Sequence, residues 1–514
     1  MFILNKTRNY EKYAELVPKV TNRPTVKQDL IIAGILKDET FEELSFECDI
    51  IRLTDNNSLS IAEDKKISLL IVDTLDKVID LADIIRLFGE KDIRCVYWDT
   101  DINNFTADYN PLKLFDFIFT VDKSRVDKFK EALGHNNVFF LPFAVQPRIF
   151  NPIENMIMNK EKDIVFPSDF QLSRVADSTC RIYDLLFKEK ADVNSILKQV
   201  MEILAVGTVT IGQFSDLIDN FFPQIIKLYK TQGEKTNLLS SINNEKEAIE
   251  KLSVLGQRAV FNNHTTTNRL DTIMQKTGLH KMIPPLPGIT VVTSTNRLNS
   301  MDNVFNNYEC QNYRNLELIV ILNNNKMDIE EWRNKAQNYD NVKIYQIDEK
   351  YPLGRCLNYA VDNSSFPYLT KFDDDNYYAP NFLSDLMLAY KYADAEIVGK
   401  LSYYCYLEGC HILGIMCPNM EYRYVNMLSG SALIIKKEVF EKVRFADKPT
   451  GCDTVFLKEC IQNGIHMYSG DQFNYVYNRH ALQENHTWKM SDEVFLKSCK
   501  VIDVTDDCKP RVTV

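Results

Sequence analysis

The sequence has no uninterrupted apolar run near the roughly twenty residues that a membrane-spanning helix requires. Its opening residues, MFILNKTRNYEKYAEL, become charged after a very short apolar start, so they lack the apolar core of a signal peptide. No stripe of clustered Lys and Arg is present, and the formal net charge of -11 disfavours contact with nucleic-acid phosphates. These absences predict a cytosolic protein that does not bind nucleic acid. Association with the inner face of the membrane and formation of a homo-oligomer both stay open.

Cysteine pairs of the kind that hold zinc are also missing. The twelve cysteines show no CxxC pair and no Cys and His spacing of a metal site, and Cys405 and Cys410 come closest to a pair. Because a cytosolic chain keeps its thiols reduced, we expect most of them to be small core residues. No segment is low-complexity, and the apolar fraction of 45% is enough for full-sized hydrophobic cores. The length of 514 residues therefore predicts two or three folded domains.

Two regions alternate short β-rich runs with segments of helical period, the pattern of parallel strands joined by crossover helices. Strands are expected in the first region at 30–36, 68–74, 93–100 and 115–122, and in the second at 288–295, 316–324, 342–348 and from 368. Between them, the segment PPLPG at 284–288 cannot continue a helix. We predict an α/β fold with a first region at 1–283 made of halves at 30–142 and 143–283, a domain at 284–490 and a tail at 491–514.

Three adjacent aspartates follow the apolar strand of YLTKFDDDN. Their mutual repulsion has to be offset by a cation or by backbone amides. Side chains alternate along an extended chain, so Asp373 and Asp375 are expected to face one ligand while Asp374 points away. Magnesium or manganese suits such hard oxygens, together with the phosphate oxygens of a substrate. The run therefore predicts a metal site, with a solvated acidic turn before a helix as the competing interpretation.

Four segments between about 287 and 490 resemble, in the family's order, the family 2 glycosyltransferases with the GT-A fold. They are TVVTSTNR, FDDDNYYAPNFL, SGSALIIKKEVFEKVRF and GCDTVFLKECIQNG. The resemblance implies an inverting, metal-dependent transfer of a sugar from a nucleoside diphosphate, with UDP as the expected carrier. It places Asp453 in the position of the catalytic base, which takes the proton from the incoming hydroxyl.

The same resemblance implies roles for further residues. For the nucleotide and its diphosphate it implies Thr293, Thr295, Arg297, Asn324, Arg355, Asn358, Asp373, Asp374, Arg479 and His480. For the ion, Mn2+ or Mg2+, it implies Asp373, Asp375 and His486, and for the sugar or acceptor it implies Ser429 and Gly430. Asn324 stands where an aspartate is usual, which leaves the nucleotide preference open. Both histidines can equally be ordinary surface residues, as most histidines without a fixed partner are.

The region from about 30 to 283 resembles the GT-B-type domains related to spore-maturation glycosyltransferases. The resemblance is carried by VYWDTD, FDFIFTVDKSRVDKF, NVFFLPFAVQPRIFNP and NNHTTTNRL, and EILAVGTV at 202–209 is similar to a donor-binding turn. The half at 143–283 ends in one long, polar, helix-like run at 245–275. DIVFPSDFQLSR lacks the glycine expected beside a phosphate. We interpret this region as degenerate, serving docking or acceptor binding.

Three hypotheses on function follow from these patterns. The first is a transferase that adds a sugar to a cell-surface glycan such as teichoic acid, a capsule or a spore polymer. The second is a catalytically inactive glycan-binding or scaffold subunit of a polysaccharide synthesis complex. The third is another phosphate chemistry, such as nucleotidyl transfer, because fold and metal do not fix the reaction. The presence of Asp373, Asp375 and Asp453 favours the first.

Overall fold

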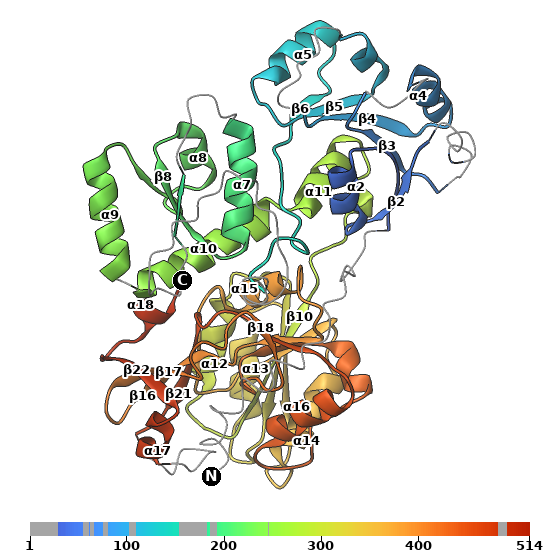
Figure 1. Ribbon diagram of the computed structural model, residues 1–514. Coiled ribbons are helices and arrows are strands. Elements are labelled where there is room, and N and C mark those ends of the chain that lie inside the picture. The colour runs from blue at the N-terminus through green and yellow to red at the C-terminus, as the bar shows by residue number, and fades with distance from the viewer. Residues whose placement is uncertain are drawn as a thin grey trace. The chain divides into compact units, whose positions relative to one another are not determined.

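The computed structural model of the protein describes residues 29–54, 61, 66–75, 81–101, 109–153, 182–185, 193–244, 246–481 and 491–514 (Figure 1). The chain forms two compact units, and the second begins at Leu286, inside the proline-rich segment at 284–288. Both units are α/β structures with parallel strands, as the sequence predicts. No helix in these described ranges is long and apolar enough to cross a membrane.

A six-stranded parallel sheet forms the first part of the N-terminal unit, in the order β2-β1-β3-β4-β5-β6. Its strands are β1 (Ile31–Ile35), β2 (Asp49–Arg52), β3 (Leu69–Val72), β4 (Arg94–Asp99), β5 (Phe117–Thr120) and β6 (Val138–Phe140). The four strands expected from the sequence are all present. The other two, β2 and β6, are the edge strands of the sheet, and most of their side chains are only partly buried.

Helices cover both faces of this sheet (Figure 1). They are α2 (Asp38–Ser45), α4 (Leu81–Glu90), the 3-10 helix η2 (Pro111–Leu114), α5 (Arg125–Leu133) and α11 (Thr266–Lys276), followed by the 3-10 helix η3 (His280–Met282). On one face α4 and α5 pack Phe88 and Phe129 into the core. On the other, α2 contributes Leu44 and α11 contributes Ile273. The last long helix of the unit therefore returns to the first sheet.

The second part of the unit has three described parallel strands in the order β7-β8-β9. Its elements are β7 (Ile182–Leu185), β8 (Val209–Gln213), β9 (Lys227–Tyr229), α7 (Val193–Ala205), α8 (Asp216–Phe221), α9 (Gln232–Asn244) and α10 (Lys246–Asn263). The helix-like run at 245–275 is two helices, α10 and α11, instead of one. Thr265 separates them because it caps α11: its Oγ1 accepts the Asn268 N–H at 3.3 Å, and Asn268 Oδ1 accepts the Thr265 N–H at 2.9 Å.

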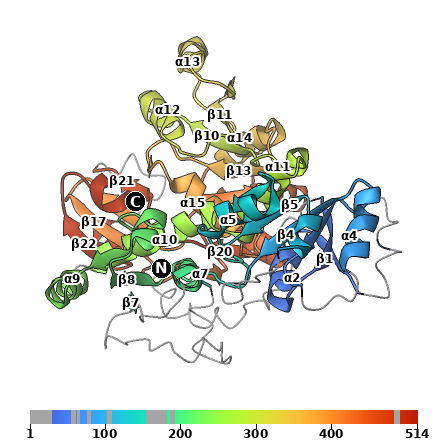
Figure 2. The same ribbon diagram turned by 90° about the horizontal axis from the view of Figure 1, so that it is seen from above.

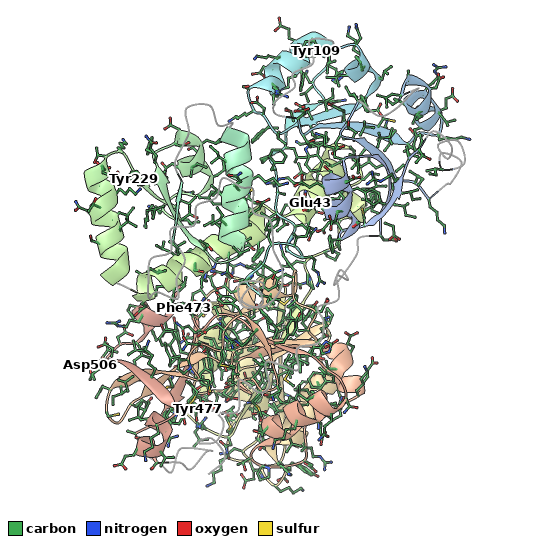
Figure 3. All side chains as sticks on the ribbon, viewed as in Figure 1. Glu43, Tyr109, Tyr229, Phe473, Tyr477 and Asp506 are labelled. Carbon is green, nitrogen blue, oxygen red and sulfur yellow. The ribbon has the colours of Figure 1, made fainter. Side chains whose placement is uncertain are left out.

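Lys198 joins the two parts of the N-terminal unit. Lys198 lies on α7, and its ammonium pairs with Glu39 of α2. The same ammonium lies 3.4 Å from the carboxylate of Glu43, also on α2; Figure 3 labels Glu43. Burial raises the pKa of Glu43 to about 7, although the charge of Lys198 lowers it. Burial likewise raises the pKa of Glu202, one turn further along α7, to about 7. Two carboxyl groups here hold their protons more tightly than in water.

We expect the N-terminal unit to lose stability as the pH rises from about 4.5 to about 7. In this window the folded state keeps protons on Glu43 and Glu202 that the unfolded chain has released, so a higher pH favours unfolding. For Glu43 the effect is at most about 3 kcal/mol. The unfolding temperature of the full chain, measured at about pH 5 and about pH 8, tests this expectation. The variant Glu202→Gln should make the unfolding temperature depend less on pH. An unfolding temperature that rises with pH contradicts the assignment.

An eight-stranded mixed sheet forms the centre of the C-terminal unit, in the order β12-β11-β10-β13-β19-β15-β20-β18. Its strands are β10 (Ile289–Thr295), β11 (Leu316–Leu322), β12 (Val342–Gln346), β13 (Tyr368–Lys371), β15 (Ile397–Gly399), β18 (Arg423–Val425), β19 (Leu433–Lys436) and β20 (Met467–Ser469). The first four neighbours run parallel and are the four strands that the sequence predicts. By contrast, β19 is antiparallel to both β13 and β15.

The helices of this unit flank the large sheet (Figures 1 and 2). They are α12 (Met301–Glu309), α13 (Ile329–Ala336), α14 (Leu353–Asp362), α15 (Phe382–Ala389), the 3-10 helix η4 (Lys437–Glu441) and α16 (Cys452–Gln462). Helix α14, expected from LGRCLNYAVDN, packs together with α16, where Leu357 and Phe456 enter one hydrophobic core. This packing fixes the start of α16 against the sheet.

A second, five-stranded sheet has the order β14-β21-β16-β17-β22. Its elements are β14 (Tyr377–Tyr378), β16 (Tyr403–Leu407), β17 (Ile412–Met416), β21 (Tyr475–Arg479) and β22 (Cys499–Val504), with α17 (Asp492–Leu496) and α18 (Lys509–Val512). Residues 491–514, expected as a tail, thus contribute a strand to the unit. The thiol nearest to Cys405 is Cys499, with 3.3 Å between the Sγ atoms, and not Cys410. All the cysteines of the described ranges are free thiols.

Candidate active site

The C-terminal ends of three parallel strands meet at one edge of the large sheet. Strand β10 ends at Thr295, β11 ends at Leu322, and β13 ends at Lys371, directly before the three aspartates. Strand β19 begins at the same edge, because it is antiparallel to β13. Side chains that follow or precede these strands therefore gather in one place.

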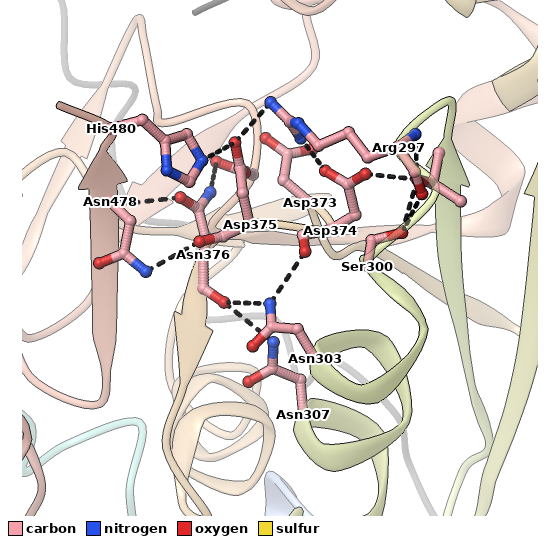
Figure 4. Close-up of polar contacts among 12 residues, drawn as sticks. Arg297, Ser300, Asn303, Asn307, Asp373, Asp374, Asp375, Asn376, Asn478 and His480 are labelled. Carbon is pink, nitrogen blue, oxygen red and sulfur yellow. Dashed lines mark hydrogen bonds and ion pairs between the residues drawn. The ribbon is translucent and has the colours of Figure 1, made fainter. Parts of the chain in front are cut away.

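Arg297 holds two of the aspartates (Figure 4). Its Nη1 pairs with Asp374, and its Nη2 lies 2.8 Å from Asp375 Oδ2. Thr295 Oγ1 donates a hydrogen bond to the other oxygen of Asp374. The expected alternation of Asp374 and Asp375 is wrong, because the residues after β13 form a turn instead of extended strand. One guanidinium thus offsets the repulsion between two neighbouring carboxylates.

Side-chain amides hold the backbone of this turn (Figure 4). Asn303 Nδ2, on α12, donates to the carbonyl of Asp374 at 2.9 Å. Asn478 Nδ2, on β21, donates to the carbonyl of Asp375 at 2.8 Å. Asn307, one turn after Asn303, donates to the next carbonyl at 2.9 Å. The turn is therefore fixed through its main chain as well as by the ion pairs of Arg297.

His480 faces Asp375 from the end of β21 (Figure 4). Its Nε2 lies 3.3 Å from Asp375 Oδ2, and its Nδ1 lies 3.1 Å from Glu408 Oε2. The hydrogen bond to Asp375 is the main cause that raises the pKa of His480. Burial pushes the pKa of Asp375 up, but the hydrogen bond with His480 and the charge of Arg297 outweigh it, so that pKa is lowered. Asp375 is therefore a carboxylate at neutral pH.

Lys371 links the aspartate run to Asp453. Its Nζ lies 2.6 Å from Asp373 Oδ1 and 3.3 Å from Asp453 Oδ2. Asp453 stands in the first turn of α16, so two carboxylates from distant parts of the sequence meet at one ammonium. The side chain of Lys371 is only 8% exposed, against 32% for Asp373 and 26% for Asp453. The lysine is thus covered, while both carboxylates stay open to a ligand.

The electrostatics of the site reflect a surplus of carboxylates. Burial would lower the pKa of Lys371, but the charges of Asp373 and Asp453 raise it above its ordinary value. Burial raises the pKa of Asp373, although Lys371 lowers it. Burial also raises the pKa of Asp374 to about 6, against the lowering effect of Arg297. A divalent cation would relieve this surplus of negative charge.

Gly430 makes room for the side chain of Asp453. A Cβ atom at position 430 would lie 2.5 Å from Asp453 Cβ and 2.6 Å from its Oδ2. On the other side, Cys452 Sγ lies 3.6 Å from Asp453 Oδ1. Residue 430 therefore has to be glycine for the carboxylate to keep its position.

Two other residues of the predicted nucleotide pocket lie at the same sheet edge. Thr293 is buried within β10. Asn324 follows β11 and donates from Nδ2 to the carbonyl of Asn296 at 2.8 Å, which joins the loops after the two strands. Their roles in donor binding stay predictions.

The two candidates on α14 have other neighbours. The guanidinium of Arg355 is exposed and lies over the ring of Tyr351, 4.2 Å from its centroid. The side-chain amide of Asn358 makes two hydrogen bonds with the backbone of Phe445. Its Nδ2 donates to the Phe445 carbonyl at 2.8 Å, and its Oδ1 accepts from the Phe445 N–H at 3.1 Å. Asn358 thus ties α14 to the chain before α16, and contact of either residue with a base stays a prediction.

Three further predicted residues are Arg479, Ser429 and His486, whose roles stay predictions. Arg479 is fully buried, with its Nε 2.6 Å from Asp492 Oδ1 and its guanidinium over Phe495, so it anchors α17 to β21. Ser429 precedes Gly430 beside Asp453. His486 lies outside the described residues.

Sequence reasoning missed several side chains that shape the site. Lys371 left a visible signal, because it is the charged residue of the otherwise uncharged strand YLTKF. Asn303, Asn307, Glu408 and Asn478 left none, since their contacts depend on how α12 and the five-stranded sheet meet the turn.

Fold and site together define an α/β domain with three aspartates after one parallel strand, β13, and a further carboxylate, Asp453, brought beside them by α16. Residues 289–442 match the family model described as Glycosyl transferase family 2. The C-terminal unit therefore contains a family 2 glycosyltransferase domain, which confirms the resemblance over residues 289–442. The segment at 451–464, with Asp453, lies outside this match. No curated protein matches the chain.

Solved structures give weaker matches. A crystal structure of S. aureus TarS 1–349 in complex with UDP-GlcNAc is 16% identical, covering 41% of this chain and 64% of that one, with a TM-score of 0.33. The mannosyltransferase PcManGT from Pyrobaculum calidifontis, in complex with GDP-Man and Mn2+, is 14% identical, covering 38% and 57%, with a TM-score of 0.29. The chain thus spans less than two thirds of either protein. At these identities and TM-scores the likeness says nothing about activity.

Proposed function

We propose that the C-terminal unit is an inverting, metal-dependent glycosyltransferase. It moves a sugar from a nucleoside diphosphate, expected to be UDP, to a hydroxyl of a cell-surface polysaccharide, teichoic acid or similar glycan. The observation that carries the proposal is the double ion pair of Lys371, which holds Asp373 and Asp453 at one point. A donor-side carboxylate and a candidate base are then within reach of one bound ligand.

The residues present fit a hard divalent ion, Mn2+ or Mg2+. Asp375 and His480 offer an oxygen and a nitrogen 3.3 Å apart, and Glu408 holds the other ring nitrogen, as is usual for a histidine that binds metal. In the described ranges no three His, Cys, Asp or Glu residues form a complete metal-binding group. Donor phosphates would supply the missing ligands. We propose Asp375 as the chief ligand, with Asp373 and His480 beside it; the role of His486 stays a prediction.

Each side chain has a distinct task in this proposal. When bound, the ion stabilises the negative charge that develops on the leaving diphosphate. Asp453 takes the proton from the acceptor hydroxyl, on the side of the sugar opposite the diphosphate. Arg297 balances the charge of Asp374 and Asp375 and so limits their mutual repulsion before donor and metal arrive.

A thermal-shift screen of UDP-sugars and GDP-sugars, with and without manganese, tests the proposal. A donor that binds the folded state raises the unfolding temperature, and we expect this rise to require manganese. The positive donor is then incubated with the protein, and release of the free nucleoside diphosphate is measured. The proposal fails if no nucleotide sugar binds under either condition.

Product analysis separates the competing functions. Donor binding without turnover would indicate a catalytically inactive glycan-binding or scaffold subunit. Release of a nucleoside monophosphate with a new phosphodiester would indicate nucleotidyl transfer. A transferase instead releases the diphosphate and leaves the sugar on the acceptor.

We further propose that the GT-B-like N-terminal unit serves docking or acceptor binding. Glu202, in the segment similar to a donor-binding turn, is half-buried, and the charge of Lys198 lowers its pKa against the effect of burial. The segment DIVFPSDFQLSR lies outside the described residues. The variant Glu202→Gln in the full chain should therefore leave release of the nucleoside diphosphate unchanged, whereas a second donor site in this unit would make it fall.

We expect Gly430→Ala to lower the turnover of sugar transfer by about tenfold or more, because misplacement of a catalytic group by an ångström is enough for such a loss. The added Cβ cannot coexist with Asp453 in its present position, so the carboxylate has to move. Turnover and unfolding temperature are measured together. Gly89→Ala is the matched control, since a Cβ there meets nothing within 4 Å. Full turnover in Gly430→Ala would show that the position of Asp453 is not critical.

A further inference from the structure

Lys371 carries a positive charge between the two carboxylates on which the proposed reaction depends. Burying an ammonium costs free energy unless a carboxylate pairs with it. Asp373, two residues further along the chain, supplies that pairing at 2.6 Å. The second ion pair reaches Asp453, 82 residues away on α16, at 3.3 Å. Burial of the lysine does not require this second contact, so it points to another role.

The surroundings of Asp453 show what the second contact does. Its Oδ2 faces the Lys371 ammonium, and the same oxygen fills the space left open by Gly430. Its Oδ1 has the thiol of Cys452 beside it. The ammonium is therefore the charged group that sets the direction of the carboxylate. Without it, Asp453 and Asp373 would repel each other and the carboxylate would turn away.

We propose that Lys371 is a positioning residue for the candidate base. Its ion pair with Asp373 keeps the ammonium in place, and its ion pair with Asp453 holds that carboxylate in the direction needed to take the acceptor proton. This inference rests on the function proposed above and extends it, because it assigns a role to a residue whose ion pairs are with Asp373 and Asp453. In this proposal Lys371 acts on the reaction through Asp453.

Two single variants of the full chain give the first measurement. Lys371→Met removes the charge and should lower the turnover of manganese-dependent donor hydrolysis and sugar transfer by about 10-fold to 100-fold. Lys371→Arg keeps a cation that can reach both carboxylates and should recover part of that loss. Lys458→Met, an exposed lysine on α16, is the matched control and should keep full turnover. The unfolding temperature of each variant reports whether its fold is intact.

A double-mutant cycle with Asp453→Asn distinguishes positioning from a general structural role. If Lys371 acts through Asp453, Lys371→Met should cause no further loss of turnover once residue 453 is asparagine. The double variant also removes one of the carboxylates that Lys371→Met leaves unpaired, so it is expected to fold even if the single variant does not. Its turnover is compared with that of Asp453→Asn alone, using the UDP-sugar or GDP-sugar that gives the largest thermal shift.

The outcomes separate this inference from the function on which it rests. Equal turnover of Asp453→Asn and the double variant, with partial recovery in Lys371→Arg, supports positioning. Losses that multiply in the double variant overturn it, and the proposed glycosyltransferase still stands. A wild-type chain that neither hydrolyses nor transfers from any donor overturns both, and the proposed function fails first.

Discussion

Asp453→Asn is expected to lower the turnover of sugar transfer by about a thousandfold, the order that a positioned general base contributes. Asparagine has nearly the same shape as aspartate and keeps an oxygen for the Lys371 ammonium, but it cannot accept the acceptor proton. Donor affinity should stay unchanged, because Asp453 acts on the acceptor. Turnover at saturating donor and calorimetric donor affinity are the two quantities to compare.

The control for this variant is Glu459→Gln, which makes the same change of charge at an exposed position of the same helix, α16. It should keep full turnover. Full transfer activity in Asp453→Asn, with donor affinity intact, would show that another group takes the proton. If donor affinity falls by as much as turnover does, Asp453 contacts the donor and not the acceptor.

Asp375→Ala is expected to abolish the manganese dependence of donor binding and to lower transfer by about a thousandfold or more, the scale of losing one chief stabiliser of transition-state charge. The variant removes the oxygen that faces both Arg297 and His480. The ion then loses its proposed chief protein ligand, and Asp373 and His480 are too few protein ligands to hold it. A manganese titration of the thermal shift, in the presence of UDP, measures the effect without any turnover.

Asp302→Ala is the matched control for this second variant. Asp302 lies on α12 with its side chain 85% exposed. The control therefore also removes one aspartate side chain, but at a position outside the aspartate turn. It should leave the manganese titration unchanged. If Asp375→Ala shows the wild-type titration, the chief ligand is a different residue, and Asp373 would be the next to change.

The sequence predicted much of the fold because the central strands are strongly apolar. LELIVIL of β11 is buried along its whole length, and such runs define a strand without help from distant residues. The short strands β2 and β6 escaped prediction, since they are held by their neighbours in the sheet more than by their own composition. The single helix expected at 245–275 was divided by Thr265, whose capping contact with Asn268 depends on a few local atoms.

The site was predicted in part for a similar reason. The aspartates and Asp453 stand in segments that can be read along the chain, and Lys371 brings Asp373 and Asp453 together. The direction of each carboxylate could not be predicted, because the chain turns after β13 instead of continuing as a strand. The alternation rule holds only for extended backbone, so it misplaced Asp374, which shares Arg297 with Asp375.

The amides of Asn303, Asn307 and Asn478 have a consequence for engineering this domain. They donate hydrogen bonds to main-chain carbonyl oxygens, so the backbone conformation of the loop does not depend on which acidic side chains it carries. An exchange such as Asp375→Asn therefore alters the charge presented to an ion while the loop keeps its shape. For the proposed metal site, we therefore expect single exchanges of these aspartates to change which ion is preferred, with the asparagines left unchanged.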